Sequence, residues 1–319
     1  MITPNETRLA KHCISHAKAC GASAARVYLN KCVTDSYTIL NGELDKVTHS
    51  ADRSIYIYLY VDGRYGTFST NRLEEKELED FVVKAIEMVR MLGEDECRQL
   101  PDPSRTAKDA VTGYELGLYD SSYESMDSQT RLANAHKLSI YDKIINDPEE
   151  KPYRLISEEC EYSCTSDESY TADSQGFEGR HSETAFGTFS EMTIQDKEGN
   201  RYSGYWWQAT PMAAETDFEG CGMMALERAV KQIGPKKRRS GRYRMVVDTS
   251  VASRLVSPLL TALNSASIQQ KMSFLDESLG TQIFPEGLTI MDLARTAGKA
   301  GSRLFDTEGV ATVDSPIIE

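Results

Sequence analysis

The fold is decided by one stretch, Ser54-Ile55-Tyr56-Ile57-Tyr58-Leu59-Tyr60-Val61, in which aliphatic residues alternate with tyrosines. Successive side chains of a β-strand point to opposite faces of the sheet, so the aliphatic residues share one face and the tyrosines share the other. The stretch therefore predicts a strand with two chemically different faces.

The segments on either side of this strand predict further strands and two helices. Asn41-Gly42 favours a tight hairpin turn, and Asp62-Gly63 turns the chain after the quoted stretch. A helix is predicted to begin near Thr3 and to end near Gly21, and another spans about Leu73–Leu92. The remaining strands predicted in this unit are Arg26–Leu29, Val33–Leu40, Glu43–His49 and Arg64–Thr70.

A second unit has the order helix, four strands, helix. Its first helix is predicted at about Asp127–Asn146 and its last at about Asp217–Gln232. Gly234-Pro235 follows the last helix, and glycine after the last turn with proline beyond it is typical of a helix end. The strands are predicted at Tyr153–Cys164, Glu168–Asp173, Glu183–Gln195 and Arg201–Ala209.

A third unit begins with a predicted strand at Tyr243–Val247. A helical region follows between about Thr249 and Lys271, which Pro258 kinks or restarts. The later part is rich in loop-forming glycines, and the chain stops at Asp314–Glu319 in what reads as the middle of a strand. We therefore expect a domain that begins but does not close, as in a fragment of a longer protein.

These elements predict a mixed α+β (α/β) fold class. The predicted domains are an N-terminal α/β domain at residues 1–98, a linker at 99–120, a middle α/β domain at 121–235 and the beginning of a third domain at 236–319. The linker is predicted because Pro101 and Pro103 lie in a segment with few periodic apolar residues. At about 150 residues per domain, a chain of 319 residues holds two domains or three small ones.

The composition excludes several classes of protein. Acidic residues exceed basic residues by 49 − 36 = 13, so phosphate backbones are repelled and we expect no direct nucleic-acid partner. No run of about 18 apolar residues occurs, which argues against a membrane protein. The first residues lack the basic-then-apolar order of a secretory signal, so the expected location is the cytoplasm. The seven cysteines form no Cys-x-x-Cys pair, so neither a disulfide framework nor a zinc knuckle is expected.

The strongest candidate for a metal site consists of His12, His16 and Cys20, spaced four residues apart on the first predicted helix. This spacing could present three ligands along one stripe. No glutamate follows either histidine, so the zinc-protease arrangement with its general base is absent. The favoured interpretation is a polar rim beside a buried thiol, and we expect no metal in this chain.

Three other clusters have ordinary structural interpretations. Cys160, Tyr162 and Cys164 share one face of a predicted strand, which indicates packing against a helix. Tyr205-Trp206-Trp207 indicates core packing rather than ligand stacking. The basic run Lys236–Arg239 indicates a solvated connector rather than a nucleic-acid patch.

No catalytic residue can be assigned from these patterns. Neither a Gly-x-Ser-x-Gly nucleophile motif nor a phosphate-binding Gly-x4-Gly-Lys-Ser/Thr motif occurs. The third unit contains no imidazole base, because every histidine precedes residue 182. The histidines are His12, His16, His49, His136 and His181.

Several short motifs, spread over essentially the whole chain, occur in the order and at the spacing that one known protein family has. The sharpest are Ser273–Gly280 (SFLDESLG) and Phe305–Thr312 (FDTEGVAT). The others are Asn41–Leu44, Asp52–Ser54, Val61–Arg64, Ser174–Phe177 and Gly241–Tyr243. With these motifs the chain resembles the TldD/PmbA family, also called the modulator-of-DNA-gyrase family. The resemblance implies an N-terminal α/β domain, a middle domain and a large β-rich C-terminal domain, of which only the beginning is present.

The family has two branches, and one of them resembles a zinc peptidase. In the TldD-like branch a helix carries His-Glu, three residues, then His; the imidazoles hold zinc and the glutamate activates water. The corresponding stretch here is Ser253–Thr261, which has no histidine, no glutamate and a proline at Pro258. Together with Phe274–Gly280, this departure makes the chain similar to the PmbA-like branch.

The resemblance implies a PmbA-like subunit of a TldD/PmbA-type metallopeptidase complex that cleaves small or unfolded peptides. Such a subunit shapes and closes the peptide-access cavity and is not catalytic by itself. Its expected partner is a zinc-bearing TldD-like chain or a second copy of itself; its own peptide-binding residues stay unknown. Two alternatives stay open: a non-enzymatic module that binds peptides or a partner, and a homodimeric peptidase whose site lies in the missing C-terminal part.

Overall fold

The computed structural model describes residues 2–95 and 97–318, which form two compact units. The first contains the residues up to Gly234 together with Leu293–Asp314, and the second contains Pro235–Asp292 together with the residues from Ser315 on. Both contain helices and strands, which confirms the predicted mixed α+β class. Among the described residues, no helix combines the length and the apolar character that crossing a bilayer requires.

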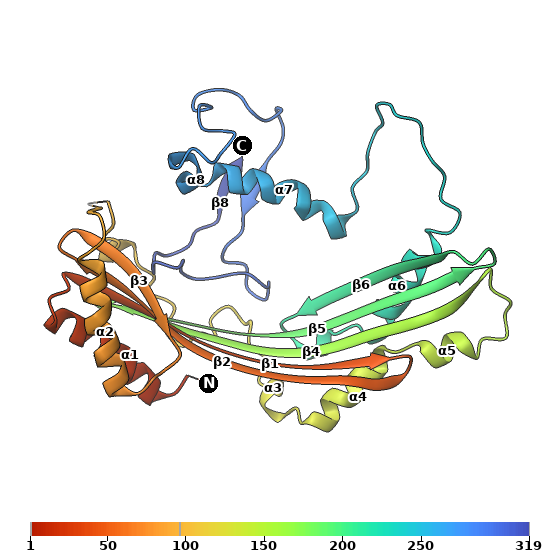
Figure 1. Cartoon of the computed structure of the whole chain (residues 1–319), viewed down its shortest axis with the longest axis horizontal. Helices are drawn as coiled ribbons and strands as arrows, with labels where there is room; N and C mark the ends of the chain where they lie inside the picture. Colours follow the sequence, from red (N-terminus) through yellow and green to blue (C-terminus); the bar gives the residue numbers. More distant parts are fainter. Residues whose placement is uncertain (1, 96, 319) are drawn as a thin grey trace. The chain divides into compact units, whose positions relative to one another are not determined.

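One antiparallel sheet of six strands is the centre of the first unit (Figure 1). Its order is β3-β2-β1-β4-β5-β6, so β1 lies between β2 and β4. The sheet thus joins segments that the sequence assigns to two domains, and the domain limits themselves stay a prediction. The strands are β1 (Ala24–Leu40), β2 (Glu43–Val61), β3 (Arg64–Thr70), β4 (Tyr153–Asp173), β5 (Glu178–Asp196) and β6 (Arg201–Thr210).

Three of these strands each join segments that were predicted as separate strands, and β5 begins five residues earlier than predicted. The segments predicted separately at Arg26–Leu29 and Val33–Leu40 are one strand, β1, and the two predicted at Tyr153–Cys164 and Glu168–Asp173 are one strand, β4. β2 likewise joins Glu43–His49 to the stretch that ends at Val61. The residues between the separately predicted strands are mostly polar, which is why the sequence indicates a break at these positions. In the structure each of these residues pairs with a residue of a neighbouring strand.

The helices of the first unit pack on one face of the sheet. At one end α1 (Pro4–Ala19) and α2 (Glu75–Val89) cover the aliphatic residues of β1 and β2. At the other end α4 (Ser128–Leu138) and α6 (Phe218–Val230) cover β4, β5 and β6. Shorter helical segments are α3 (Ser122–Ser125), α5 (Tyr141–Ile145), Pro103–Arg105 and Ala213–Glu215.

The helix predicted at Asp127–Asn146 is wrong in its continuity, because the chain leaves the helix at Ser139. A buried carboxylate from β4, Glu158, lies at this break. It accepts hydrogen bonds from the N–H groups of Ile140 (2.8 Å) and Tyr141 (3.2 Å) and from the hydroxyl of Ser139. Glu158 therefore provides hydrogen-bond acceptors for backbone N–H groups at the start of α5, which have no partner within the helix.

Residues 99–120, predicted as a linker, contribute buried side chains to a third hydrophobic cluster. Ala107, Ala110, Leu116 and Leu118 pack there with Phe177, the residue before β5, and with Leu304 and Phe305. Leu304 and Phe305 belong to Leu293–Asp314, called the returning segment because the chain comes back to the first unit there. The rings of Phe177 and Phe305 are 5.4 Å apart. This cluster attaches Leu293–Asp314 to the sheet.

The second unit contains α7 (Thr249–Leu263), α8 (Ser265–Gln269) and a two-stranded sheet of β7 (Ile290–Asp292) and β8 (Ser315–Ile318). The strand predicted at Tyr243–Val247 is wrong: this segment is in neither a helix nor a strand, and Val246 is 91% exposed. Helix α7 continues through Pro258, and the restart occurs instead at Asn264, whose side chain caps α8.

Candidate functional site

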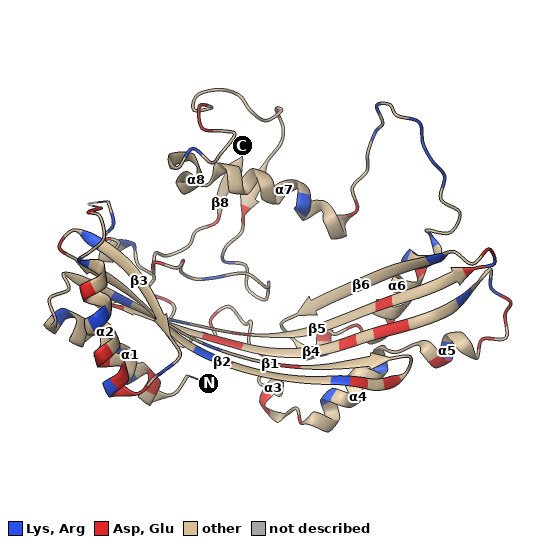
Figure 2. Ribbon diagram, viewed as in Figure 1, with Lys and Arg blue, Asp and Glu red and all other residues tan. Residues whose placement is uncertain are grey.

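The face of the sheet opposite the helices is polar and carries a pocket of about 360 Å³. Because side chains alternate along a strand, residues next to the core positions of β1, β2 and β4 all point to this face. Acidic residues occur along β4 and β5 (Figure 2). The pocket is lined by Tyr28, Asn30, Ser54, Tyr56, Tyr58 and Asp167. Two of these tyrosines belong to the alternating stretch from which the fold was predicted.

Hydrogen bonds and ring contacts hold the lining of the pocket in place. The side-chain amide of Asn30 donates to both carboxylate oxygens of Asp167, at 3.3 and 3.2 Å, and to the hydroxyl of Tyr28 at 3.4 Å. The ring of Tyr28 lies 5.9 Å from that of Tyr56. The buried guanidinium of Arg26 lies 4.3 Å from the ring centre of Tyr58. Burial raises the pKa of Tyr28, and the charge of Asp167 adds to this effect, so its hydroxyl stays a hydrogen-bond donor at neutral pH.

The chemistry of this pocket suits binding rather than bond cleavage. Amide, carboxylate and phenol groups can hydrogen-bond to a peptide backbone, and the tyrosine rings provide apolar contact area. Among the residues that line the pocket there is neither a cysteine nor a histidine, so the lining itself supplies no thiolate and no imidazole base. The pocket therefore qualifies as a binding surface for an extended, partly apolar ligand.

A charged network lies beside the pocket on the same face. Glu183 of β5 pairs directly with Asp167 of β4. Arg303 of the returning segment donates to both oxygens of Glu183, at 3.0 and 2.9 Å, and His181 lies 3.4 Å from one of them. The hydrogen bond from His181, with those from Arg303, lowers the pKa of Glu183 from 4.5 to about 2. The network ties the returning segment to the sheet.

Replacing Glu183 by glutamine should destabilise the chain by about 2 kcal/mol at about pH 7, the value typical of hydrogen bonds to a charged group. Because the pKa of Glu183 is lowered by folding, its stabilisation is complete above the ordinary value of 4.5 and is lost as the pH falls toward about 2. Urea denaturation across this pH range should show the parent and the variant converging in acid. Glu191→Gln, on the same face of β5, is the control; an equal loss in both variants would contradict the assignment.

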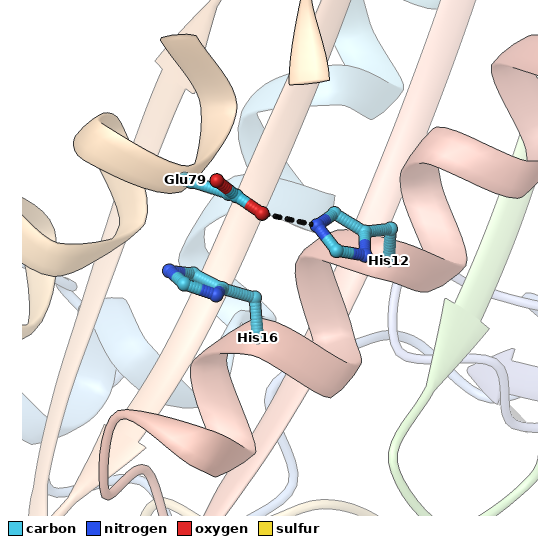
Figure 3. Close-up of side chains that lie close together, drawn as sticks. All are labelled: His12, His16 and Glu79. Atoms are coloured by element: carbon cyan, nitrogen blue, oxygen red, sulfur yellow. Dashed lines mark hydrogen bonds and ion pairs between the residues drawn. The ribbon is translucent and has the colours of Figure 1, made fainter. Parts of the chain in front are cut away.

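The structure adds Glu79, a residue distant in sequence, to the candidate metal-binding residues His12 and His16 of the first helix. His12 and His16 lie one turn apart on α1, and Glu79 of α2 points toward both (Figure 3). The Nε2 atom of His12 is 2.8 Å from Oε1 of Glu79. One ligand atom from each residue lies within 4.8 Å of the others. Cys20 is half-buried, with its Sγ atom 3.5 Å from Nε2 of His16.

Sequence reasoning missed Glu79 because it considered only the spacing within α1. A signal was present: Glu75 and Glu79 are four residues apart, so they share one face of α2. What the sequence does not reveal is that this face of α2 lies against the histidine face of α1.

The other sequence candidates lie where their structural interpretations place them, with one exception. Cys160, Tyr162 and Cys164 are buried on one face of β4 against α4 and α6, and burial raises the pKa of both thiols. Trp206 packs against α6, but Tyr205 and Trp207 are 47% and 59% exposed, so core packing is wrong for these two. Lys236–Arg239 is exposed and in neither a helix nor a strand, within the basic connector that precedes α7 (Figure 2).

Helix α7 contains Ser253–Thr261, the stretch where the zinc helix of the TldD-like branch is expected. No histidine, cysteine, aspartate or glutamate occurs between Thr249 and Leu263. Zinc needs nitrogen, sulfur or carboxylate ligands from the protein. The residues of α7 therefore do not fit a zinc centre.

Comparisons with known proteins agree over most of the chain. Family models match residues 25–89 (PmbA/TldA metallopeptidase domain 1), 71–233 (the central domain) and 240–319 (the C-terminal domain). The Metalloprotease PmbA of Escherichia coli is 25% identical over 93% of this chain, and a homologue from Haemophilus influenzae is 24% identical over 95%. The chain spans 64% and 65% of the lengths of these two relatives.

Solved structures show the same fold. A protein from Bacteroides thetaiotaomicron, described as a candidate modulator of DNA gyrase, superposes with a TM-score of 0.90 at 35% identity. The match covers 100% of this chain and 71% of that one. TldE from Thermococcus kodakarensis superposes with a TM-score of 0.68 at 16% identity, covering 98% of this chain and 67% of that one.

Proposed function

The chain belongs to the TldD/PmbA family, and from this premise we propose that it is a PmbA-like subunit of a peptidase complex and lacks the catalytic zinc helix. The observation that carries the proposal is α7, which has no zinc ligand in the stretch where the TldD-like branch has its motif. The catalytic metal then belongs to a TldD-like partner chain. This chain spans only 64% of the length of the relative from Escherichia coli. The peptidase activity of the whole protein is therefore part of what we propose.

The role proposed for this chain is to bind and orient the peptide. The polar face of the sheet supports it, because the pocket combines backbone-binding groups with tyrosine rings. An extended segment presents N–H and C=O groups that Asn30, Asp167 and the phenol hydroxyls can satisfy. The excess of acidic residues favours peptides over DNA as the ligand, and we place the complex in the cytoplasm as a dimer of unlike chains.

The division of labour follows from what amide hydrolysis requires. At neutral pH the reaction needs an activated water or nucleophile and a group that stabilises the oxyanion. In the zinc arrangement of the TldD-like branch, one metal with its glutamate supplies both. The partner therefore performs the chemistry, and this chain completes the walls of the cavity.

The test is a peptide-cleavage assay with the full-length protein and a TldD-like chain, each alone and then mixed. We expect cleavage of an unstructured peptide only in the mixture, and its loss when the glutamate of the partner's zinc motif is changed to alanine. Activity of this protein alone that survives chelation would overturn the proposal. Chelator-sensitive activity of this protein alone would overturn it too, in favour of a homodimeric peptidase. Binding without cleavage in any tube would instead indicate a binding module.

A further inference from the structure

A second cluster of ligand-type side chains lies on the helix-bearing side of the sheet, away from the pocket. It consists of His12 and His16 on α1 and Glu79 on α2 (Figure 3). Two imidazoles and one carboxylate form a donor set that binds zinc and related divalent ions, with a fourth position left for water. We propose that these three residues bind one divalent transition-metal ion, of which zinc is the representative, and thereby link α1 to α2.

The distances fit an ion after small side-chain rotations. Ligand atoms at about 2.1 Å from a tetrahedral ion lie roughly 3.4 Å from one another. His12 and Glu79 already approach to 2.8 Å, and the ligand atoms of all three residues lie within 4.8 Å. The side chains of His12 and Glu79 are 31% and 38% exposed, so they have room to rotate and an ion can reach them from solvent.

The helices beneath the cluster hold the ligands at a fixed spacing. Cys13 and Ala17 of α1 and Leu78 and Val82 of α2 are buried in the same hydrophobic core. The three ligand side chains therefore project from packed helices rather than from loops, which favours a defined coordination geometry. The rings of His12 and His16 are stacked with centres 6.0 Å apart, as expected for residues one turn apart.

The surroundings add negative charge to the site. Oε1 of Glu75 is 4.0 Å from Nε2 of His12, and Arg8 holds the other oxygen of Glu75 at 2.9 Å. Glu75 therefore stays beside the ligands, where a carboxylate attracts a cation. Sγ of Cys20 lies 3.5 Å from Nε2 of His16, and we assign no bond between this thiol and the ion.

This site departs from the expectation, drawn from the sequence alone, that the chain holds no metal. It is also independent of the proposed function, because its ligands lie on the helix-bearing face and not among the residues of the pocket. Binding an ion here stabilises the packing of α1 on α2 and needs no peptide and no partner chain.

The experiment uses the purified chain after treatment with a chelator that is then removed. Titration with zinc chloride in a calorimeter should show one ion per chain, and cobalt chloride should produce the visible absorption bands of a low-symmetry Co²⁺ site. His12→Ala and His16→Ala should each weaken zinc binding at least about 10-fold, and Glu79→Gln should weaken it as well. Zinc should raise the Tm of the parent but not that of His16→Ala.

Two variants serve as controls. His136→Ala removes an exposed histidine of α4, far along the sheet, and should bind zinc as the parent does. Cys20→Ala should also retain binding. Zinc uptake that persists unchanged in both His12→Ala and His16→Ala would overturn the proposal, as would the absence of any uptake by a parent chain with a native circular dichroism spectrum. The conservative Glu79→Gln keeps the helices intact, so its effect reports on ligation.

Discussion

Gly204→Ala should destabilise the chain by about 3 kcal/mol, the upper end of what overpacking a core costs. Gly204 is a buried residue of β6, and α6 lies directly on it. A Cβ atom at this position would lie 2.2 Å from the backbone nitrogen of Ala229 and 2.5 Å from the carbonyl oxygen of Ala225. Backbone atoms cannot rotate away as a side chain can, so the whole helix must move from the sheet.

That movement would open the core beneath α6, where Met192 and Ile194 of β5 are fully buried. The measurement is the urea midpoint of Gly204→Ala compared with the parent. Gly93→Ala is the matched control, because its Cβ would meet nothing within 4 Å and its backbone is not in the left-handed region. Equal midpoints for Gly204→Ala and the parent would show that α6 does not press on β6.

The local elements of this fold were predictable because their causes are local. Asn41 and Gly42 have φ values of 52° and 85°, and Asp62 and Gly63 have 50° and 69°, as a tight hairpin turn requires at both positions. The start of α1 was predictable for a similar reason. Thr3 caps the first turn, accepting a hydrogen bond from the N–H of Glu6, and Glu6 accepts one from the N–H of Thr3.

The errors arose where distant residues decide local structure. The break between α4 and α5 depends on Glu158, whose carboxylate reaches Ile140 from another element. The strand predicted at Tyr243–Val247 has the right side chains, but the structure assigns it no partner strand. A strand needs a neighbour to satisfy its backbone groups, and composition does not say whether one is present.

Only the part of the candidate site that comes from β2 could be predicted, because the rest depends on how distant strands pair. Alternation along Ser54–Val61 separates a tyrosine face from an aliphatic face, and Tyr56 and Tyr58 do line the pocket. Their partners come from β1 and β4, where Asn30 pairs with Ser54 on one side and with Ser169 on the other. Strand register is set by the whole sheet, so no spacing in the sequence places Asp167 beside Asn30.

Ser54→Trp should lower the kcat/KM of the mixed peptidase for an unstructured peptide at least about 10-fold, corresponding to about 1.4 kcal/mol of lost transition-state binding. Ser54 is half-buried in the wall of the pocket, and an indole ring there occupies the volume that a peptide side chain would need. The Tm should stay close to that of the parent, because the helix-bearing core lies on the opposite face.

The control is Val47→Trp, which introduces the same ring on the same strand. Val47 is 52% exposed, and it points to the other face because it is an odd number of residues from Ser54. We therefore expect Val47→Trp to leave kcat/KM unchanged. A Ser54→Trp protein with full activity would show that the peptide does not cross this pocket. Equal losses in both variants would point to a general effect of the ring on the strand, whereas loss in Ser54→Trp alone assigns the polar face to peptide binding.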